Sequence, residues 1–244
     1  MTREAEVPGW GLEVKGLTKS FGHMMVLRGI NLRVPRGEFL TIFGPNAAGK
    51  TTLLKILATV SKPSSGEVRI LGLSLKEASI EIRRRIGVVT HDTLLYDDLT
   101  VHENLKFYGK MYDVPQLGER IDQLAGEMGL EPYFRQRVRS LSHGMQKRVS
   151  IARAVIHNPD LVLLDEPEAG LDQRATEMLA EMLNGLRREG RTIVMTTHNL
   201  ERGLKMGDCV AILARGKLVF KEARLEVDAA SFQETYLRYT GVPR

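Results

Sequence analysis

Residues 44–52 read GPNAAGKTT, and no other stretch indicates the fold as directly. It fits the pattern G-x-x-x-x-G-K-[ST], in which loop N–H groups and a helix N-terminus surround a phosphate group. An apolar run at 39–43 precedes it and an apolar segment at 53–58 follows it, which predicts a strand, a loop and a helix. This order disfavours the alternative, a glycine-rich turn that ends in a solvated lysine. The residues predicted to bind nucleotide here are Gly44, Pro45, Asn46, Ala47, Ala48, Gly49, Lys50, Thr51 and Thr52.

Short apolar runs bounded by turn residues recur along the chain and predict further strands, with helical patterns between several of them. Strands that alternate with helices favour an α/β fold with a largely parallel sheet. Residues 11–36 look like short antiparallel strands with turns at Gly22, Gly29 and 35–37, and residues 101–140 look like a helical insertion. The predicted strands are 39–43, 68–71, 86–89, 161–164, 192–196 and 210–213.

Length and composition narrow the class of protein. A chain of 244 residues with one cysteine, Cys209, is long enough for one domain and excludes a disulfide framework or a cysteine-rich metal site. Apolar runs such as 161–164 are too short to span a bilayer, and residues 1–6 show no apolar secretion segment, so we expect a cytosolic protein. The net charge of +5 permits an anionic partner without selecting one.

Two adjacent carboxylates end the apolar run at 161–164. Asp165 at the end of a strand can hold Mg²⁺ through water, and Glu166 can act as the general base that polarises the attacking water. His198 follows another predicted strand and could contact the γ-phosphate. In the phosphate loop, Lys50 is expected to meet the β- and γ-phosphates and Thr51 to ligate Mg²⁺. Together these residues predict ATP hydrolysis with Mg²⁺ as cofactor.

Residues 141–146, LSHGMQ, carry a family resemblance. With the phosphate loop before them and the Asp-Glu strand, the GLD loop at 170–172 and the Thr-His pair after them, the chain resembles the nucleotide-binding subunit of ABC (ATP-binding cassette) proteins over roughly 11–220. The resemblance implies a P-loop NTPase core with a mainly parallel sheet, an N-terminal antiparallel β layer and an inserted helical subdomain. It implies one domain at 7–240, with the helical subdomain at about 95–150 and a C-terminal helical tail at 222–240.

The resemblance also implies partners and further site residues. In the family, the signature of one subunit closes over ATP held by the other, so Ser142 and Gly144 would act in trans in an ATP-bound homodimer. Phe21 matches the aromatic residue that stacks on adenine, and packing in the core is the alternative for it. The run 132–159 holds six basic and no acidic residues, which suits either an anion-facing loop or a solvated helix face.

Three positions depart from the family pattern. Ala47 stands where a third loop glycine is usual, which costs on the order of 1 kcal/mol if that position needs a positive φ. His143 and Met145 replace the usual glycine and glutamine of the signature. Asp92 or His91 replaces a glutamine that senses Mg²⁺ and the attacking water. Asp92 could still ligate the metal, and we predict slower basal hydrolysis than with glutamine.

The resemblance predicts the motor subunit of an ABC transporter, bound to a separate transmembrane permease at the cytoplasmic face of the membrane. Residues 91–108 look most like haem-exporter ATPases of cytochrome c maturation, although His91 and His102 are not expected to bind haem. The alternatives are an exporter ATPase for a drug, lipid or polysaccharide, and a soluble assembly ATPase of the iron–sulfur scaffold type. Nucleic acid is not an expected partner, because ABC proteins that act on it usually carry coiled-coil insertions or a second cassette.

The C-terminal residues are less informative. Phe232, Tyr236 and Tyr239 recur at helical spacing, which predicts a terminal helix. Packing of these side chains on the core is the favoured interpretation, and a partner-docking stripe is the alternative.

Overall fold

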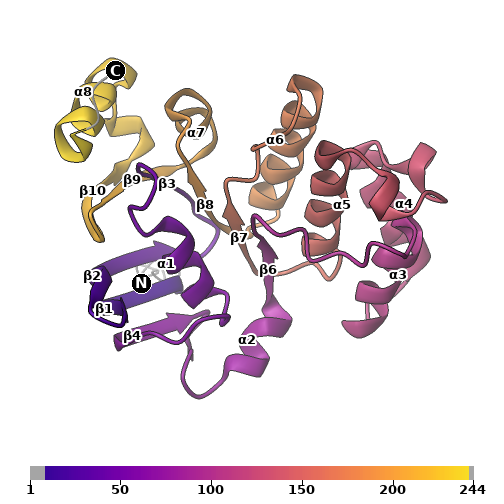
Figure 1. Cartoon of the computed structure of the whole chain (residues 1–244), viewed down its shortest axis with the longest axis horizontal. Helices are drawn as coiled ribbons and strands as arrows, with labels where there is room; N and C mark the ends of the chain where they lie inside the picture. The colour runs from indigo at the N-terminus through magenta and orange to yellow at the C-terminus, as the bar shows by residue number, and fades with distance from the viewer. Residues whose placement is uncertain (1–8, 242–244) are drawn as a thin grey trace, which may run out of the picture.

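The structure is a computed structural model that describes residues 9–241. Figure 1 shows an antiparallel sheet at one side of the molecule, a parallel sheet in the middle and a group of helices at the other side. Residues 1–6, expected to lack a secretion segment, and residues 7–8 of the predicted domain lie outside the described residues.

The central sheet has six strands in the order β10-β9-β3-β8-β7-β6. All neighbours in it are parallel except β10, which pairs with β9 in the antiparallel sense. Every residue of β3, β7, β8 and β9 is buried, which explains why these strands are mainly apolar in sequence on both faces. The strands are β3 (Phe39–Phe43), β6 (Ile86–Val89), β7 (Leu161–Asp165), β8 (Thr192–Thr197), β9 (Cys209–Ala214) and β10 (Lys217–Ala223).

The second sheet has four antiparallel strands in the order β2-β1-β4-β5. Its strands are β1 (Trp10–Phe21), β2 (Met24–Pro35), β4 (Ser65–Ile70) and β5 (Leu73–Ser74). The predicted turn at Gly22 is confirmed, because it joins β1 to β2. The predicted turn at Gly29 is wrong: this residue lies inside β2, where its φ of +76° bends the strand without ending it. The antiparallel layer is thus two long strands rather than several short ones.

Helices cover both faces of the central sheet. The group α3, α4 and α5 forms the side farthest from the antiparallel sheet in Figure 1. Capping side chains fix where helices begin: Thr100 and Glu103 form a capping box on α3, and Ser142 and Asp172 cap α5 and α6. The helices are α1 (Lys50–Leu57), α2 (Ser79–Arg85), α3 (Val101–Met111), α4 (Leu117–Met128), α5 (His143–Val155), α6 (Gln173–Arg188), α7 (Leu200–Met206) and α8 (Ala229–Thr240). Short 3₁₀ helices lie at Glu131–Tyr133, Val138–Ser140 and Arg224–Glu226.

The two faces of the central sheet belong to different cores. Leu161 and Leu163 of β7 pack with α1 and the antiparallel sheet, whereas Val162 and Leu164 pack with the helices α3 to α6. Because all the parallel strands point the same way, β3, β7 and β8 end at one edge of the sheet. The segments that follow them therefore meet at that edge.

Candidate nucleotide site

The phosphate loop leaves β3 and enters α1 at Lys50. Gly49 precedes the helix with a φ of +107°, and a Cβ on it would lie 2.8 Å from Leu27 Cδ2. Glycine is required there for both reasons. Ala47 has a φ of +61°, so the condition under which alanine costs free energy at this position is met.

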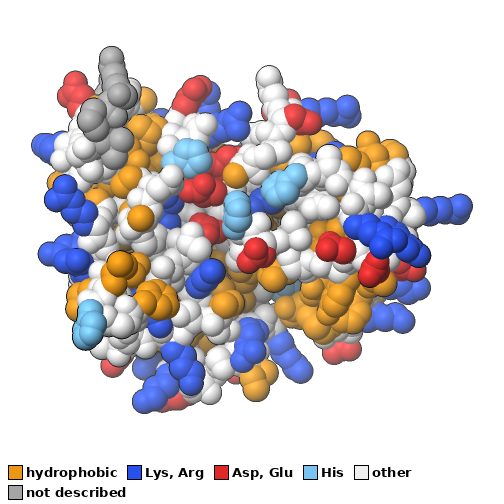
Figure 2. Space-filling model, in the orientation of Figure 1, with side chains coloured by type: hydrophobic (Ala, Val, Ile, Leu, Met, Phe, Trp, Pro, Cys, Tyr) orange, Lys and Arg blue, Asp and Glu red, His pale blue; other side chains and the backbone are white. Residues whose placement is uncertain are grey.

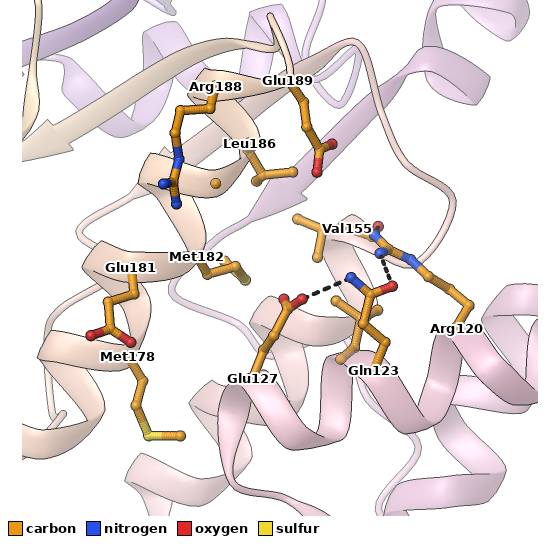
Figure 3. A pocket seen from close by; sticks show the side chains of 12 residues that line it. Arg120, Gln123, Glu127, Val155, Met178, Glu181, Met182, Leu186, Arg188 and Glu189 are labelled. Atoms are coloured by element: carbon orange, nitrogen blue, oxygen red, sulfur yellow. Dashed lines mark hydrogen bonds between the residues drawn. The ribbon is translucent and has the colours of Figure 1, made fainter.

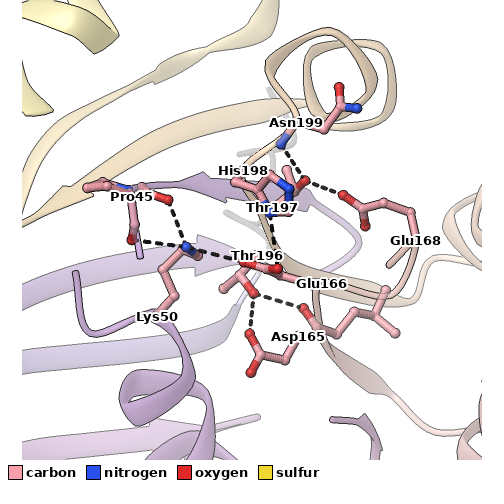
Figure 4. A network of polar contacts seen from close by, with 11 residues as sticks. Pro45, Lys50, Asp165, Glu166, Glu168, Thr196, Thr197, His198 and Asn199 are labelled. Atoms are coloured by element: carbon pink, nitrogen blue, oxygen red, sulfur yellow. Dashed lines mark hydrogen bonds and ion pairs between the residues drawn. The ribbon is translucent and has the colours of Figure 1, made fainter. Parts of the chain in front are cut away.

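The Lys50 side chain turns back toward its own loop. It is 5% exposed, and Nζ donates hydrogen bonds to the carbonyl oxygens of Gly44 at 2.7 Å and Pro45 at 3.2 Å. Nζ also lies 3.3 Å from Glu166 Oε1 (Figure 4). The structure therefore joins the phosphate loop to the carboxylate strand through one ammonium group.

Glu166 links the other two residues predicted to be catalytic, Lys50 and His198. Its Oε2 lies 3.0 Å from His198 Nδ1, on the side away from Lys50. Glu166 has a φ of +46°, a left-handed backbone that is uncommon for a residue with a side chain. The three residues predicted to be catalytic thus lie in one continuous contact, and the strained backbone turns the Glu166 carboxylate out of the line of β7.

Asp165 is held at the last position of β7. Its side chain is buried, and Thr196 Oγ1 donates a hydrogen bond to Oδ1 at 2.6 Å. Sequence analysis did not single out Thr196, because its pairing with Asp165 follows from the parallel register of β7 and β8 in the structure. This hydroxyl fixes the orientation of the carboxylate that is predicted to face Mg²⁺.

Glu168 and Thr197 also belong to the site and were not predicted. The Thr197 hydroxyl donates to Glu168 Oε1 and accepts the backbone N–H of Asn199 at 3.0 Å. These bonds tie the loop after β7 to the segment that carries His198 (Figure 4). No pattern in the sequence separates Glu168 from an ordinary loop carboxylate.

The signature residues lie on the helical side of the molecule. Ser142 caps α5 by accepting the Met145 N–H at 3.3 Å, and a Cβ on Gly144 would lie 3.0 Å from the Gly170 carbonyl oxygen. Within residues 9–241, no hydrogen bond or ion pair joins 142–146 to the phosphate loop. Figure 1 places α5 and α1 well apart. One chain therefore does not bring its signature to its own phosphate loop.

Phe21 lies at the end of β1 and is 55% exposed, so the alternative of core packing is wrong. Lys19 Nζ lies 4.7 Å from the centre of its ring. An exposed ring of this kind is free to stack on a base, and its role in binding adenine stays a prediction. Asp92 and His91 are also exposed, and the Asp92 carbonyl accepts a hydrogen bond from the Thr90 hydroxyl at 2.7 Å. The role of the Asp92 side chain as a metal ligand stays a prediction.

The basic run 132–159 is neither a solvated face nor a set of groups that all meet an anion. Lys147 and Arg153 are buried and donate to backbone carbonyls, while Arg139 pairs with Asp98 at 2.9 Å. Part of this charge is thus used inside the molecule, while Arg135, Arg137 and Arg139 stay exposed.

Figure 2 shows acidic side chains and histidines gathered near the middle of one face, where β8 and α7 lie in Figure 1. A pocket of about 230 Å³ lies elsewhere, between α4 and α6, with Arg120, Met182 and Glu189 among its lining residues (Figure 3). None of the predicted site residues lines that pocket. The candidate site is therefore the edge of the parallel sheet.

A phosphate loop after a parallel strand, with a lysine that meets the carboxylate of Glu166 at the end of another parallel strand, defines a nucleoside triphosphatase of the P-loop class. Residues 27–169 match the family described as ABC transporter, and the chain belongs to this family as its ATP-binding cassette. ABC cassettes hydrolyse ATP, so the chain is an ATPase.

Known proteins of this family align over most of the chain. The ABC transporter ATP-binding protein NatA of Bacillus subtilis is 36% identical over 200 residues, which are 81% of this chain and 81% of that protein. The Nod factor export ATP-binding protein I of Ralstonia nicotianae is 35% identical over 218 residues, 87% of this chain and 68% of that protein. A dimeric post-hydrolysis structure of the cassette MJ0796, bound to ADP and Pi, has a TM-score of 0.82 and 29% identity, and the match covers 87% of this chain and 98% of that one. Within residues 9–241, no helix combines the length and the apolar character needed to cross a bilayer.

Proposed function

We propose that this ATPase is the motor subunit of an ABC exporter. In this proposal two copies hold two ATP molecules between them and act on a separate transmembrane permease at the cytoplasmic face of the membrane. The observation that carries the proposal is the separation of the signature residues Ser142 and Gly144 from the phosphate loop of their own chain. The dimeric solved relative supports an arrangement in which a second copy supplies them.

The site residues fit Mg²⁺. Thr51 is exposed on the first turn of α1, and Thr196 fixes the carboxylate of Asp165. A hydroxyl and a carboxylate are oxygen donors of the kind that Mg²⁺ prefers. Thr51, and Asp165 through water, would hold the ion, whose charge would offset the charge that develops on the phosphate oxygens.

The chain's own residues supply the remaining chemistry. Lys50 and the loop N–H groups bind the phosphates, and Glu166 accepts a proton from the attacking water. The contact between Glu166 Oε2 and His198 Nδ1 at 3.0 Å orients the carboxylate for this step. Phe21 would bind the adenine from the antiparallel sheet.

Two observations bear on the class of cargo that the exporter would carry. Residues 91–108 support haem export, whereas the name of the Ralstonia relative refers to export of Nod factor and supports the alternative of another cargo. A six-span permease encoded beside cytochrome c maturation genes would favour haem. The relatives named for transport and export, NatA and the Nod factor export protein, support a transporter over the assembly-ATPase alternative.

Glu166→Gln should stop hydrolysis at the ATP-bound stage, because an amide cannot accept the proton from water. We expect this variant to run as a dimer on size exclusion with ATP and Mg²⁺, and as a monomer without nucleotide. The double variant Lys50→Ala/Glu166→Gln is the control and should stay monomeric, because it loses the contact to the phosphates. A monomeric Glu166→Gln protein that still binds ATP would contradict the dimer.

A further inference from the structure

Three buried polar side chains form a row on α5. Lys147, Ser150 and Arg153 lie three residues apart and so share one face of the helix. Their exposed fractions are 3%, 0% and 8%. Lysine and arginine are rarely buried without a partner, because removing their charge from water costs free energy. The row therefore needs a structural or functional explanation.

Two members of the row hold the segment that connects β6 to α3. Ser150 Oγ donates a hydrogen bond to the carbonyl of Thr93 at 2.8 Å, and Arg153 Nη2 donates to the carbonyl of Val88 at 3.0 Å. The loop at 90–93 between these two carbonyls is the one that carries the replacement for the glutamine sensor. The signature helix thus forms hydrogen bonds on both sides of this loop.

Lys147, the third member of the row, holds the start of the same loop. Its Nζ donates to the Thr90 carbonyl at 3.0 Å, the one hydrogen bond of this side chain within the described residues. An ammonium group has three N–H donors, so this bond uses one of them. Burial lowers the pKa of Lys147, and the charges of Asp165, Glu168 and Glu166 oppose that shift. The buried ammonium group therefore holds the loop at Thr90, where its hydrogen bond is formed.

We propose that Lys147 is a positioning residue for ATP hydrolysis, which ties the start of the loop after β6 to the signature helix. The hydrogen bond to Thr90 and the attraction toward the carboxylates act on the same ammonium group. The start of the loop cannot move away from α5 without breaking the hydrogen bond to Thr90, while Ser150 holds the other end of the loop. The inference rests on the ATPase assignment and not on the exporter proposal.

Because Lys147 lies on α5 and not in the phosphate loop, its loss should affect turnover more than nucleotide affinity. We expect Lys147→Met to lower kcat by roughly ten- to a hundredfold, the usual cost of a misplaced reacting group. Affinity for ATP, measured by equilibrium binding, should stay within about twofold of wild type, which a loss of packing alone would not predict. Hydrogen–deuterium exchange should become faster in peptides that cover 88–95, and Lys147→Arg should restore most of the turnover.

Arg148→Met is the matched control. This neighbouring cation points to α4, where Nη1 donates to the Met128 carbonyl at 3.1 Å, so turnover and exchange at 88–95 should stay close to wild type. If Lys147→Met does not fold, Ser150→Ala should increase exchange in the same peptides. Equal turnover in Lys147→Met and Arg148→Met, or unchanged exchange at 88–95, would overturn the positioning role. An inactive wild type would instead overturn the ATPase assignment, and the exchange experiment would still decide on the role of Lys147.

Discussion

At the scale of the residue, two non-glycine residues on opposite sides of the same site have a left-handed backbone conformation. Ala47 in the phosphate loop has a φ of +61°, and Glu166 after β7 has a φ of +46°. A left-handed conformation costs a residue with a Cβ roughly 1–2 kcal/mol. The loop tolerates Ala47 because its side chain is small and the turn is closed by a hydrogen bond from Ala48 N to the Pro45 carbonyl at 3.2 Å. At Glu166 the same strain aims the carboxylate at Lys50 and His198.

Asp92 is the residue that departs most clearly from the family pattern. We expect Asp92→Gln to raise basal kcat severalfold, because an amide both donates and accepts hydrogen bonds and adds no negative charge near Asp165 and Glu166. Steady-state ATPase assays at saturating ATP and Mg²⁺ measure this. Asp97→Asn, a similar change at an exposed position of the same segment, should leave kcat unchanged. Equal or slower turnover in Asp92→Gln would contradict the prediction.

At the scale of the element, the sequence predicted what buried parallel strands require. The bounds of β3 and β6 match the predicted runs because each is a short apolar stretch with turn residues on both sides. Gly29 was misplaced because glycine signals a turn and a bulge equally well, and pairing with β1 decides between them. Glu168 and Thr196 could not be identified because their roles depend on which strands are neighbours. Lys147 could not be separated from a surface charge, since its burial depends on how α5 packs against β6.

The terminal helix α8 gives an element-scale prediction. Phe232 is 1% exposed, and its ring lies 5.1 Å from that of Phe43, the last residue of β3 before the phosphate loop. Phe232→Ala should lower the free energy of unfolding by about 3–5 kcal/mol, the usual cost of a cavity left by a buried aromatic ring. Tyr239→Ala, at a 37% exposed position of the same helix, should cost much less. Urea denaturation of the two variants measures this, and equal losses would contradict the packing of α8 on the core.

At the scale of the whole molecule, the helical group is attached to the parallel sheet partly through His157. Its ring stacks on Tyr112 at 3.9 Å between centroids, and Nε2 lies 3.1 Å from the Ile86 carbonyl oxygen. The contact thus joins the end of α3, the segment after α5 and the first residue of β6. Burial lowers the pKa of His157 from 6.5 to about 4.

This lowered pKa predicts that the free energy of unfolding falls in acid. Between pH 6.5 and 4 the unfolded chain binds a proton at His157 that the folded chain does not, so stability is complete above this range and falls as the pH falls through it. His157 should lower the free energy of unfolding by about 2 kcal/mol between pH 7 and pH 5. His157→Phe keeps a ring against Tyr112 and removes the titration, so its unfolding free energy should depend less on pH over that interval. An unchanged pH dependence in urea titrations would contradict the buried neutral histidine.

The close approach of Gly144 to the Gly170 carbonyl has a consequence for timing. The start of α5 and the loop before α6 approach each other so closely that a Cβ on Gly144 would lie 3.0 Å from the Gly170 carbonyl oxygen, and the His143 ring lies beside Gly170. In the proposed two-fold pair this contact occurs twice, once beside each ATP. A displacement of either segment would then move the other. Because the signature would face the partner's ATP while the loop before α6 follows Glu166 of its own site, the two sites would open and close together. Larger side chains at position 144 should therefore uncouple the opening of the two sites before they unfold either subunit.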